Sequence, residues 1–193
     1  MDDDFDLAAK LASRICHDLI SPVGAIGNGM ELLAMTGLKG SPELALVEES
    51  VAGAQGRIRF FRVAFGRAEP GQAVSGSEIA DTLAGYIGGG RVAVDWPEPG
   101  AVPRDELRAI FLAINCLEVE LAYGGVITVQ PGWEIVAQAE RMRGEEEAWC
   151  VAQGGPGEVS PAKVQFALLP KAVAALGRDL EVVRGDGEIV VRF

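Results

Sequence analysis

The chain of 193 residues contains a single histidine, His17, followed at once by Asp18 and five residues later by Pro22. Imidazole titrates near neutral pH, and its neutral form is a competent nucleophile when one ring nitrogen is free. The carboxylate of Asp18 could orient that ring or contact a partner, while Pro22 removes a helical N–H and loosens the helix beside the histidine. We therefore predict His17 and Asp18 as catalytic residues, against the plain alternative of an ordinary surface histidine.

The residues around His17 predict a long amphipathic helix that ends near Leu38. Apolar residues recur every three or four positions, as expected for one helical face: Leu7, Leu11, Ile15, Leu19, Ile26, Met30 and Leu33. At ~100° per residue, His17 lies roughly opposite this stripe and faces water. Its neighbours on that face are mostly small or polar, and Arg14, Ser21 and Gly24 among them are candidates for docking a partner protein.

A second helix begins after the glycines of residues 37–40, with Ser41 as N-cap and Pro42 at the first helical position. Its apolar residues alternate in steps of three and four, the period of a coiled coil: Leu44, Val47, Val51, Ala54, Ile58, Phe61 and Phe65. The two helices form a hairpin. Two hairpins from two chains would complete a four-helix bundle, which predicts a homodimer; the alternative is packing against the chain's own C-terminal part.

The hairpin geometry also predicts which residues lie level with the histidine. With a turn near residue 39 or 40, antiparallel helices pair positions whose numbers sum to about 79. His17 then lies level with Arg62, and Arg59 is one turn away. Residues 51–67 carry four arginines and no acid. We predict Arg59 and Arg62 as docking residues for an acidic partner, the alternative being solvated or ion-paired arginines.

Pro70 and Gly71 mark a boundary, beyond which the hydrophobic period changes. Helices are predicted at residues 75–88, 103–122 and 161–176, and strands at 91–96, 126–129, 133–140 and 148–152. A terminal hairpin, 180–184 and 188–192, turns over residues 185–187. This order predicts an α/β sandwich with one mainly antiparallel sheet covered on one face by helices.

The His-acid-Leu-x-x-Pro order at His17 resembles the phospho-accepting H box of histidine kinases and dimeric histidine phosphotransferases. The second half is similar in element order to the GHKL ATP-binding domain of those kinases, with three departures. Gln153 replaces the aspartate of the first glycine box, the helix around Asn115 has one asparagine where the family has two, and residues 163–169 contain no glycine. Bulky side chains there obstruct the backbone N–H groups that a phosphate loop needs.

Together with the segment from Arg62 to Gly66, these motifs give the whole chain a resemblance to the ChpT-type bacterial histidine phosphotransferases. The resemblance implies an α+β protein: residues 1–67 form a helical hairpin for dimerisation and phosphotransfer, and residues 73–193 form a degenerate ATPase-like sandwich. It implies that His17 relays phosphoryl from the receiver domain of a hybrid histidine kinase to response-regulator receivers, with no cofactor of its own and Mg²⁺ on the receiver. The alternatives are an ATP-dependent histidine kinase and a non-catalytic dimeric module.

Charge and composition exclude other classes. The net charge is −11, which is unfavourable for nucleic-acid binding, and 49% of residues are apolar without a run approaching the ~20 residues of a membrane span. The acidic start is unlike a signal peptide. Cys16, Cys116 and Cys150 have no metal-ligand spacing and each sits among apolar residues. We predict reduced core thiols and a cytoplasmic protein.

Overall fold

The structure is a computed structural model that describes residues 12, 19–20, 23–33, 35, 42–69, 71–88 and 90–193. Its contacts divide the chain into two units. The first comprises Met1–Arg67 with Asp81–Gly88, and the second comprises Ala68–Ala80 with Gly89–Phe193. The grouping of residues 81–88 with the hairpin has no signal in the sequence, because these residues continue a helix that begins in the second unit.

The first unit contains the predicted helical hairpin. Residues 23–33 are helical, and α2 runs from Pro42 to Ala64. A Cβ atom on Gly27 would lie 3.2 Å from Nε2 of Gln55 and 3.5 Å from Cγ1 of Val51, so the two helices pass closely at this level. These pairs sum to 78 and 82, which confirms the predicted pairing of levels for the described part of the hairpin. The start of the first helix, the turn and the predicted N-cap Ser41 lie outside the described residues.

Helix α2 is buried on a different face from its coiled-coil stripe. Phe60, Val63 and Ala64 are buried, and they belong to the face that meets the end of α3 (Gly76–Ile87). Along the stripe, only Leu44 is buried; Val47 is 41% exposed and Ile58 is half-buried. The predicted stripe is therefore present, and most of its residues are partly buried within the described chain.

The second unit is built on a five-stranded sheet in the order β2-β4-β5-β7-β6. The strands are β2 (Val92–Asp95), β4 (Gly125–Gln130), β5 (Glu134–Gln138), β6 (Glu181–Gly185) and β7 (Glu188–Arg192). β2 and β4 are parallel and the other neighbours are antiparallel. A separate pair, β1 (Ala73–Val74) with β3 (Val102–Pro103), was not predicted from the sequence.

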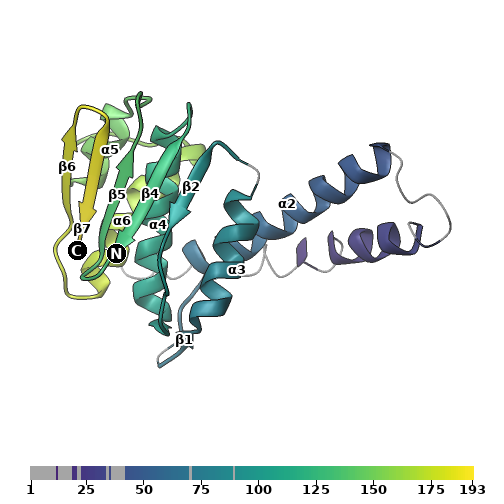
Figure 1. The fold of residues 1–193 in the computed structure, drawn as a ribbon. Coiled ribbons are helices and arrows are strands. Elements are labelled where there is room, and N and C mark those ends of the chain that lie inside the picture. The colour runs from purple at the N-terminus through teal and green to yellow at the C-terminus, as the bar shows by residue number, and fades with distance from the viewer. Residues whose placement is uncertain are drawn as a thin grey trace. The chain divides into compact units, whose positions relative to one another are not determined.

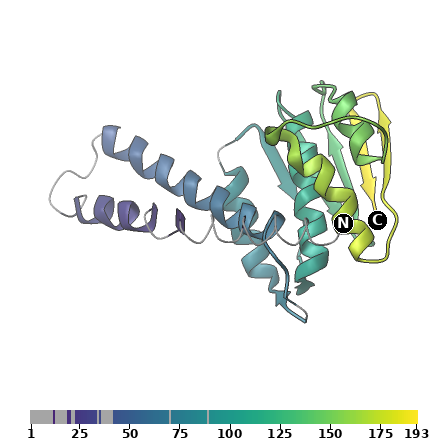
Figure 2. The same ribbon diagram turned by 180° about the vertical axis from the view of Figure 1, so that it is seen from behind.

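Helices cover one face of this sheet, as predicted. Figure 1 shows the sheet in front of α4 (Arg104–Glu120) and α6 (Val164–Ala175), and Figure 2 shows these helices from behind. Alternate residues of each strand face them, so that Ile127, Ile135 and Val191 are fully buried. The terminal hairpin forms where expected, with Gly187 at φ 72°, a conformation that suits glycine in a tight turn.

The strand predicted at residues 148–152 is wrong, because Glu146–Ala152 form a helix, α5. A short apolar run does not by itself distinguish a buried strand from a helix. Here Glu146 and Glu147 occupy the first turn, where negative charge favours a helix N-terminus, and Trp149 is fully buried with its ring edge-on to Phe166 at 4.9 Å. The Gly-Gly-Pro-Gly segment therefore follows a helix and not a strand.

The prediction of core thiols is confirmed at only one of the two described cysteines. Cys116 is buried on α4, and its burial raises the pKa of the thiol well above its ordinary value. Cys150 is exposed on α5, because the helix turns this position away from the side of Trp149. Cys16 lies outside the described residues.

Candidate functional site

Of the predicted site residues, the structure describes Gly24, Arg59 and Arg62. His17, Asp18, Arg14 and Ser21 lie outside the described residues, so their predicted roles stay predictions. Gly24 is half-exposed in the first helix, and a Cβ atom added to it would meet no atom within 4 Å. Arg59 and Arg62 are exposed near the C-terminal end of α2. Backbone near Gly24 is thus open to close approach by another molecule.

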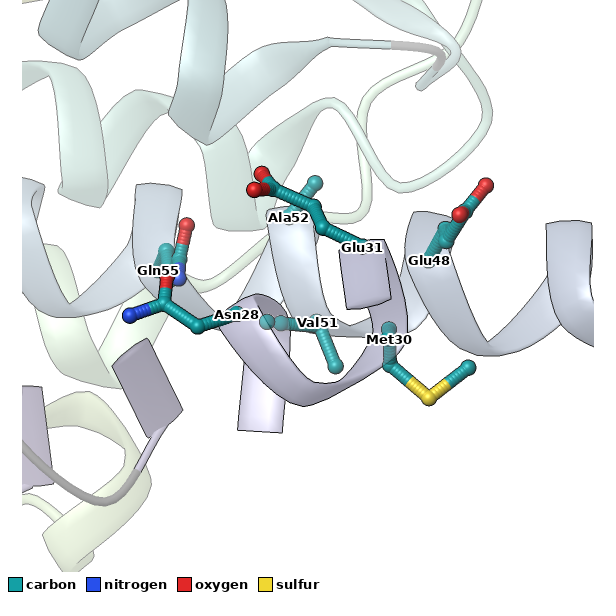
Figure 3. Close-up of a pocket in the computed structure, with 8 residues that line it drawn as sticks. Asn28, Met30, Glu31, Glu48, Val51, Ala52 and Gln55 are labelled. Carbon is teal, nitrogen blue, oxygen red and sulfur yellow. The ribbon is translucent and has the colours of Figure 1, made fainter. Parts of the chain in front are cut away.

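A groove of about 430 Å³ runs between the two helices of the hairpin. It is lined by Gly27, Asn28, Met30 and Glu31 of the first helix and by Glu48, Val51, Ala52 and Gln55 of α2. Figure 3 shows Glu31 and Glu48 pointing to the same side of the hairpin, while Met30 points the opposite way. Asn28 and Gly24 share a helical face because they are four residues apart. Of the groove residues, Asn28 therefore lies on the face for which the sequence predicts the histidine, whereas Met30 and Val51 belong to the apolar stripes.

Charge is segregated along α2. Glu48 and Glu49 lie in its first half, and the arginines at 57, 59 and 62 lie in its second half. This arrangement follows the helix dipole, which favours acids near the N-terminus and bases near the C-terminus. A partner with an acidic surface would be attracted to the arginine end and repelled from the glutamate end, so the hairpin itself can orient such a partner.

In the second unit, the residues predicted as remnants of a nucleotide site engage the protein itself. Gln153 ends α5, and its side-chain amide donates to the carbonyl of Val182 at 3.4 Å. Asn115 is 7% exposed on α4 and points its amide toward Glu118 at 3.5 Å.

Sequence reasoning missed the most constrained carboxylate of the unit, Glu120. This residue is fully buried at the end of α4. Its carboxylate accepts from the backbone N–H of Gly144 at 2.7 Å, from that of Glu145 at 2.9 Å and from the indole N–H of Trp149 at 2.9 Å. The sequence carries only a weak signal for this role, since Glu118 and Glu120 both lie among apolar residues of the same predicted helix.

A second layer of charge surrounds this carboxylate. Glu145 is buried and pairs with Lys163 and with Nε of Arg143, the latter at 3.0 Å. Glu146 pairs with Arg184, and the hydrogen bond from that guanidinium lowers the pKa of Glu146 below its ordinary value. The start of α5 is thus held by the buried Glu120 carboxylate and by three ion pairs.

Two negative findings apply to the described part of the chain. No group of three or more His, Cys, Asp or Glu side chains is arranged to hold a metal ion there. Among the described helices, none has the length and apolar character to cross a membrane.

The chain matches the family of histidine phosphotransferase C-terminal domains over residues 76–188, more than half of its length. It belongs to the histidine phosphotransferase family. The ChpT-type resemblance seen in the sequence is confirmed: a stretch of 63 residues, 33% of the chain, is 54% identical to the protein phosphotransferase ChpT of Brucella abortus (strain 2308). That stretch spans only 30% of the length of ChpT.

A solved structure of a bacterial phosphotransferase has the same fold as this histidine phosphotransferase. The two align with a TM-score of 0.65 over 97% of this chain and 94% of the other, at 21% sequence identity. An identity this low supports the fold alone. The similar fold covers nearly the full length of both chains, so the helical hairpin and the sandwich occur together in both proteins.

Proposed function

We propose that this histidine phosphotransferase relays phosphoryl groups through His17, between aspartates of receiver domains in a two-component pathway. The observation that carries the proposal is that a member of this family contains only one histidine. A phosphoryl group transferred through histidine therefore has one possible acceptor in the chain. The position of His17 in the H-box pattern supports the same assignment.

The chemistry uses neutral imidazole as the nucleophile. A ring nitrogen of His17 attacks phosphorus, a P–N bond forms, and the P–O bond to the receiver aspartate breaks, which regenerates a free carboxylate. The same steps in reverse pass the group to a second aspartate. The transition state resembles metaphosphate and needs cationic stabilisation, which Mg²⁺ and a lysine of the receiver supply. Asp18 orients the ring or contacts the receiver.

The receiver docks on the groove face of the hairpin. Gly24 has no side chain, so the receiver can come close to the helix backbone there. Arg14 and Ser21 flank the nucleophile in the sequence pattern. Arg59 and Arg62, both exposed at the basic end of α2, attract the acidic cluster of a receiver. Glu31 and Glu48 in the groove repel the same cluster and so favour the orientation that places the acidic site near His17.

The functional unit is a homodimer in which two hairpins form a four-helix bundle. The support is Val47 of the α2 stripe, which is 41% exposed, together with exposed apolar residues of the first helix, among them Ile26 at 53% and Leu33 at 47%. Large apolar side chains gathered on one helical face favour burial against a partner. We also propose a cytoplasmic location, because the cysteines have no disulfide or metal pattern.

We propose that the chain does not phosphorylate itself from ATP. Gln153 cannot act as the carboxylate that accepts from an adenine amine, and residues 163–169 have no glycine to expose backbone N–H groups. The competing candidate is an ATP-dependent histidine kinase. The support for this candidate is the order of helices and strands, which resembles that of the GHKL domain. The labelling experiment below distinguishes the kinase from the relay.

The test uses labelled phosphate from two sources. The purified chain is incubated with γ-labelled ATP and Mg²⁺ alone, and separately with labelled receiver domains from the same genome. Label from a receiver, absent from a His17→Ala variant of unchanged circular dichroism, supports the relay. Label from ATP alone supports the kinase, and no label from either source refutes both and leaves a non-catalytic module.

A further inference from the structure

The end of α3 crosses α2 at a contact between two glycines. A Cβ atom on Gly56 would collide with the carbonyl group of Gly85, and one on Gly85 would lie 3.3 Å from Cα of Gly56. Both glycines are helical, and glycine is less favourable than alanine in a helix interior. Close approach of the two backbones explains their presence in these helices.

Aromatic stacking locks this crossing beside the glycines. The rings of Phe60 and Tyr86 are stacked with centroids 3.7 Å apart and 9° between their planes. Phe60 is fully buried and Tyr86 is 7% exposed. The end of α3 is therefore fixed on α2 at a defined level, next to the basic half of that helix.

Two arginines of α2 lie against this end of α3. Nη2 of Arg59 is 3.1 Å from the place where a Cβ atom on Gly85 would lie, so its guanidinium rests where a side chain at residue 85 would be. The guanidinium carbon of Arg57 lies 5.8 Å from the ring centroid of Tyr86, within cation–π range. Neither arginine forms an ion pair within the part of the chain that the structure describes.

This arrangement presents charge in a fixed position without neutralising it. A free arginine side chain loses rotamer entropy when it is immobilised, which weakens binding. Contacts with Gly85 and Tyr86 restrict Arg59 and Arg57 before any partner binds, so less entropy remains to be lost on binding. An ion pair would have restricted them too, but it would have cancelled the charge that an acidic partner needs.

We propose that the end of α3 is part of the receiver-docking surface, and that Gly85 is a positioning residue that directs the guanidinium of Arg59 toward an acidic receiver. This inference rests on the proposed function, because it specifies how the same docking face recognises its partner. Gly85 acts through Arg59 and does not touch the transferred phosphoryl group. Residue 85 then influences which receivers bind, although it lies on a different helix from the nucleophile.

The test compares Gly85→Ala with the parent protein. A methyl group at residue 85 displaces the Arg59 guanidinium, so the Kd for fluorescently labelled receiver domains from the same genome should rise by about three- to tenfold. The limiting rate of phosphoryl transfer at saturating receiver should not change. Gly53→Ala is the matched control, because a Cβ atom there meets nothing within 4 Å, and it should leave the Kd unchanged.

A double-mutant cycle decides whether Gly85 acts through Arg59. In an Arg59→Ala background, Gly85→Ala should have no further effect on the receiver Kd. Additive effects, or an equal fall in the limiting transfer rate, overturn the proposal. If Gly85→Ala does not fold, Arg59→Lys replaces it in the test. Lysine keeps the positive charge but not the position of the guanidinium, so the Kd should rise, and an unchanged Kd refutes the positioning role.

Binding and labelling separate this inference from the proposed function. Receiver affinity is measured by fluorescence anisotropy and does not require the chemistry of His17. A receiver that binds more weakly to Gly85→Ala but never labels His17 supports the docking surface and refutes the relay. If His17 is labelled but substitutions at residues 59 and 85 leave the receiver Kd unchanged, the relay is supported and the docking surface is refuted.

Discussion

Replacement of Glu120 tests whether a buried carboxylate holds α5 in place. In Glu120→Leu, three donors lose their acceptor: the N–H groups of Gly144 and Glu145 and the indole N–H of Trp149. Each buried donor left without a partner costs about 1–3 kcal/mol. Gly144 is exposed and can bond to water, whereas Glu145 and Trp149 are buried. Two orphaned donors predict a loss of about 4 kcal/mol in the free energy of unfolding.

Glu120→Gln makes a sharper comparison. Glutamine keeps one oxygen, which can still accept from Glu145 and Trp149, but its amide nitrogen faces the N–H of Gly144, the donor that water can reach. The expected loss is about 1–2 kcal/mol. Glu147→Gln is the control on α5, since Glu147 is exposed, and its effect should stay within about 0.5 kcal/mol.

Urea unfolding followed by far-UV circular dichroism measures these losses as shifts in midpoint at constant slope. The expected order of stability is parent and Glu147→Gln, then Glu120→Gln, then Glu120→Leu. A leucine variant within 1 kcal/mol of the parent, or a glutamine variant as unstable as the leucine variant, would show that these hydrogen bonds do not hold α5.

Three further predictions concern the dimer, the docking face and pH. Ile58→Glu should yield monomers or aggregates by light scattering, since a charge in the bundle core is left unpaired, whereas Ala52→Glu on the groove side should stay dimeric. Arg62→Ala should weaken receiver association and reduce the salt dependence of the transfer rate; unchanged kinetics would remove Arg62 from the docking face. The lowered pKa of Glu146 means that its pair with Arg184 stabilises the fold above the ordinary glutamate pKa of about 4.3 and loses that contribution as pH falls through the lowered value. The difference in Tm between the parent and Glu146→Gln should therefore be constant from about pH 5.5 to 8 and shrink toward pH 3.

Local patterns in the sequence determined most of the elements and the family. The start of α3 matches the helix predicted from residue 75. The Ser75 hydroxyl accepts there from the N–H of Glu78 at 3.3 Å, and such a cap is a local feature because it involves residues a few positions apart. The same is true of the terminal hairpin, whose turn needs glycine at positive φ. Even the pairing of hairpin levels followed from the place of the turn, since antiparallel helices rise equally per residue.

Only the tertiary structure determined which of these elements pack against one another. Residues 148–152 have an apolar pattern that suits a strand or a helix. The choice of helix depends on Glu120, which is far away in the sequence but whose carboxylate accepts from the N–H of Glu145 at the start of α5. The grouping of the end of α3 with α2 depends on Gly56 meeting Gly85 and on Phe60 stacking with Tyr86. Sequence periodicity specifies which face of a helix is apolar, but contacts between distant segments determine which partner covers that face.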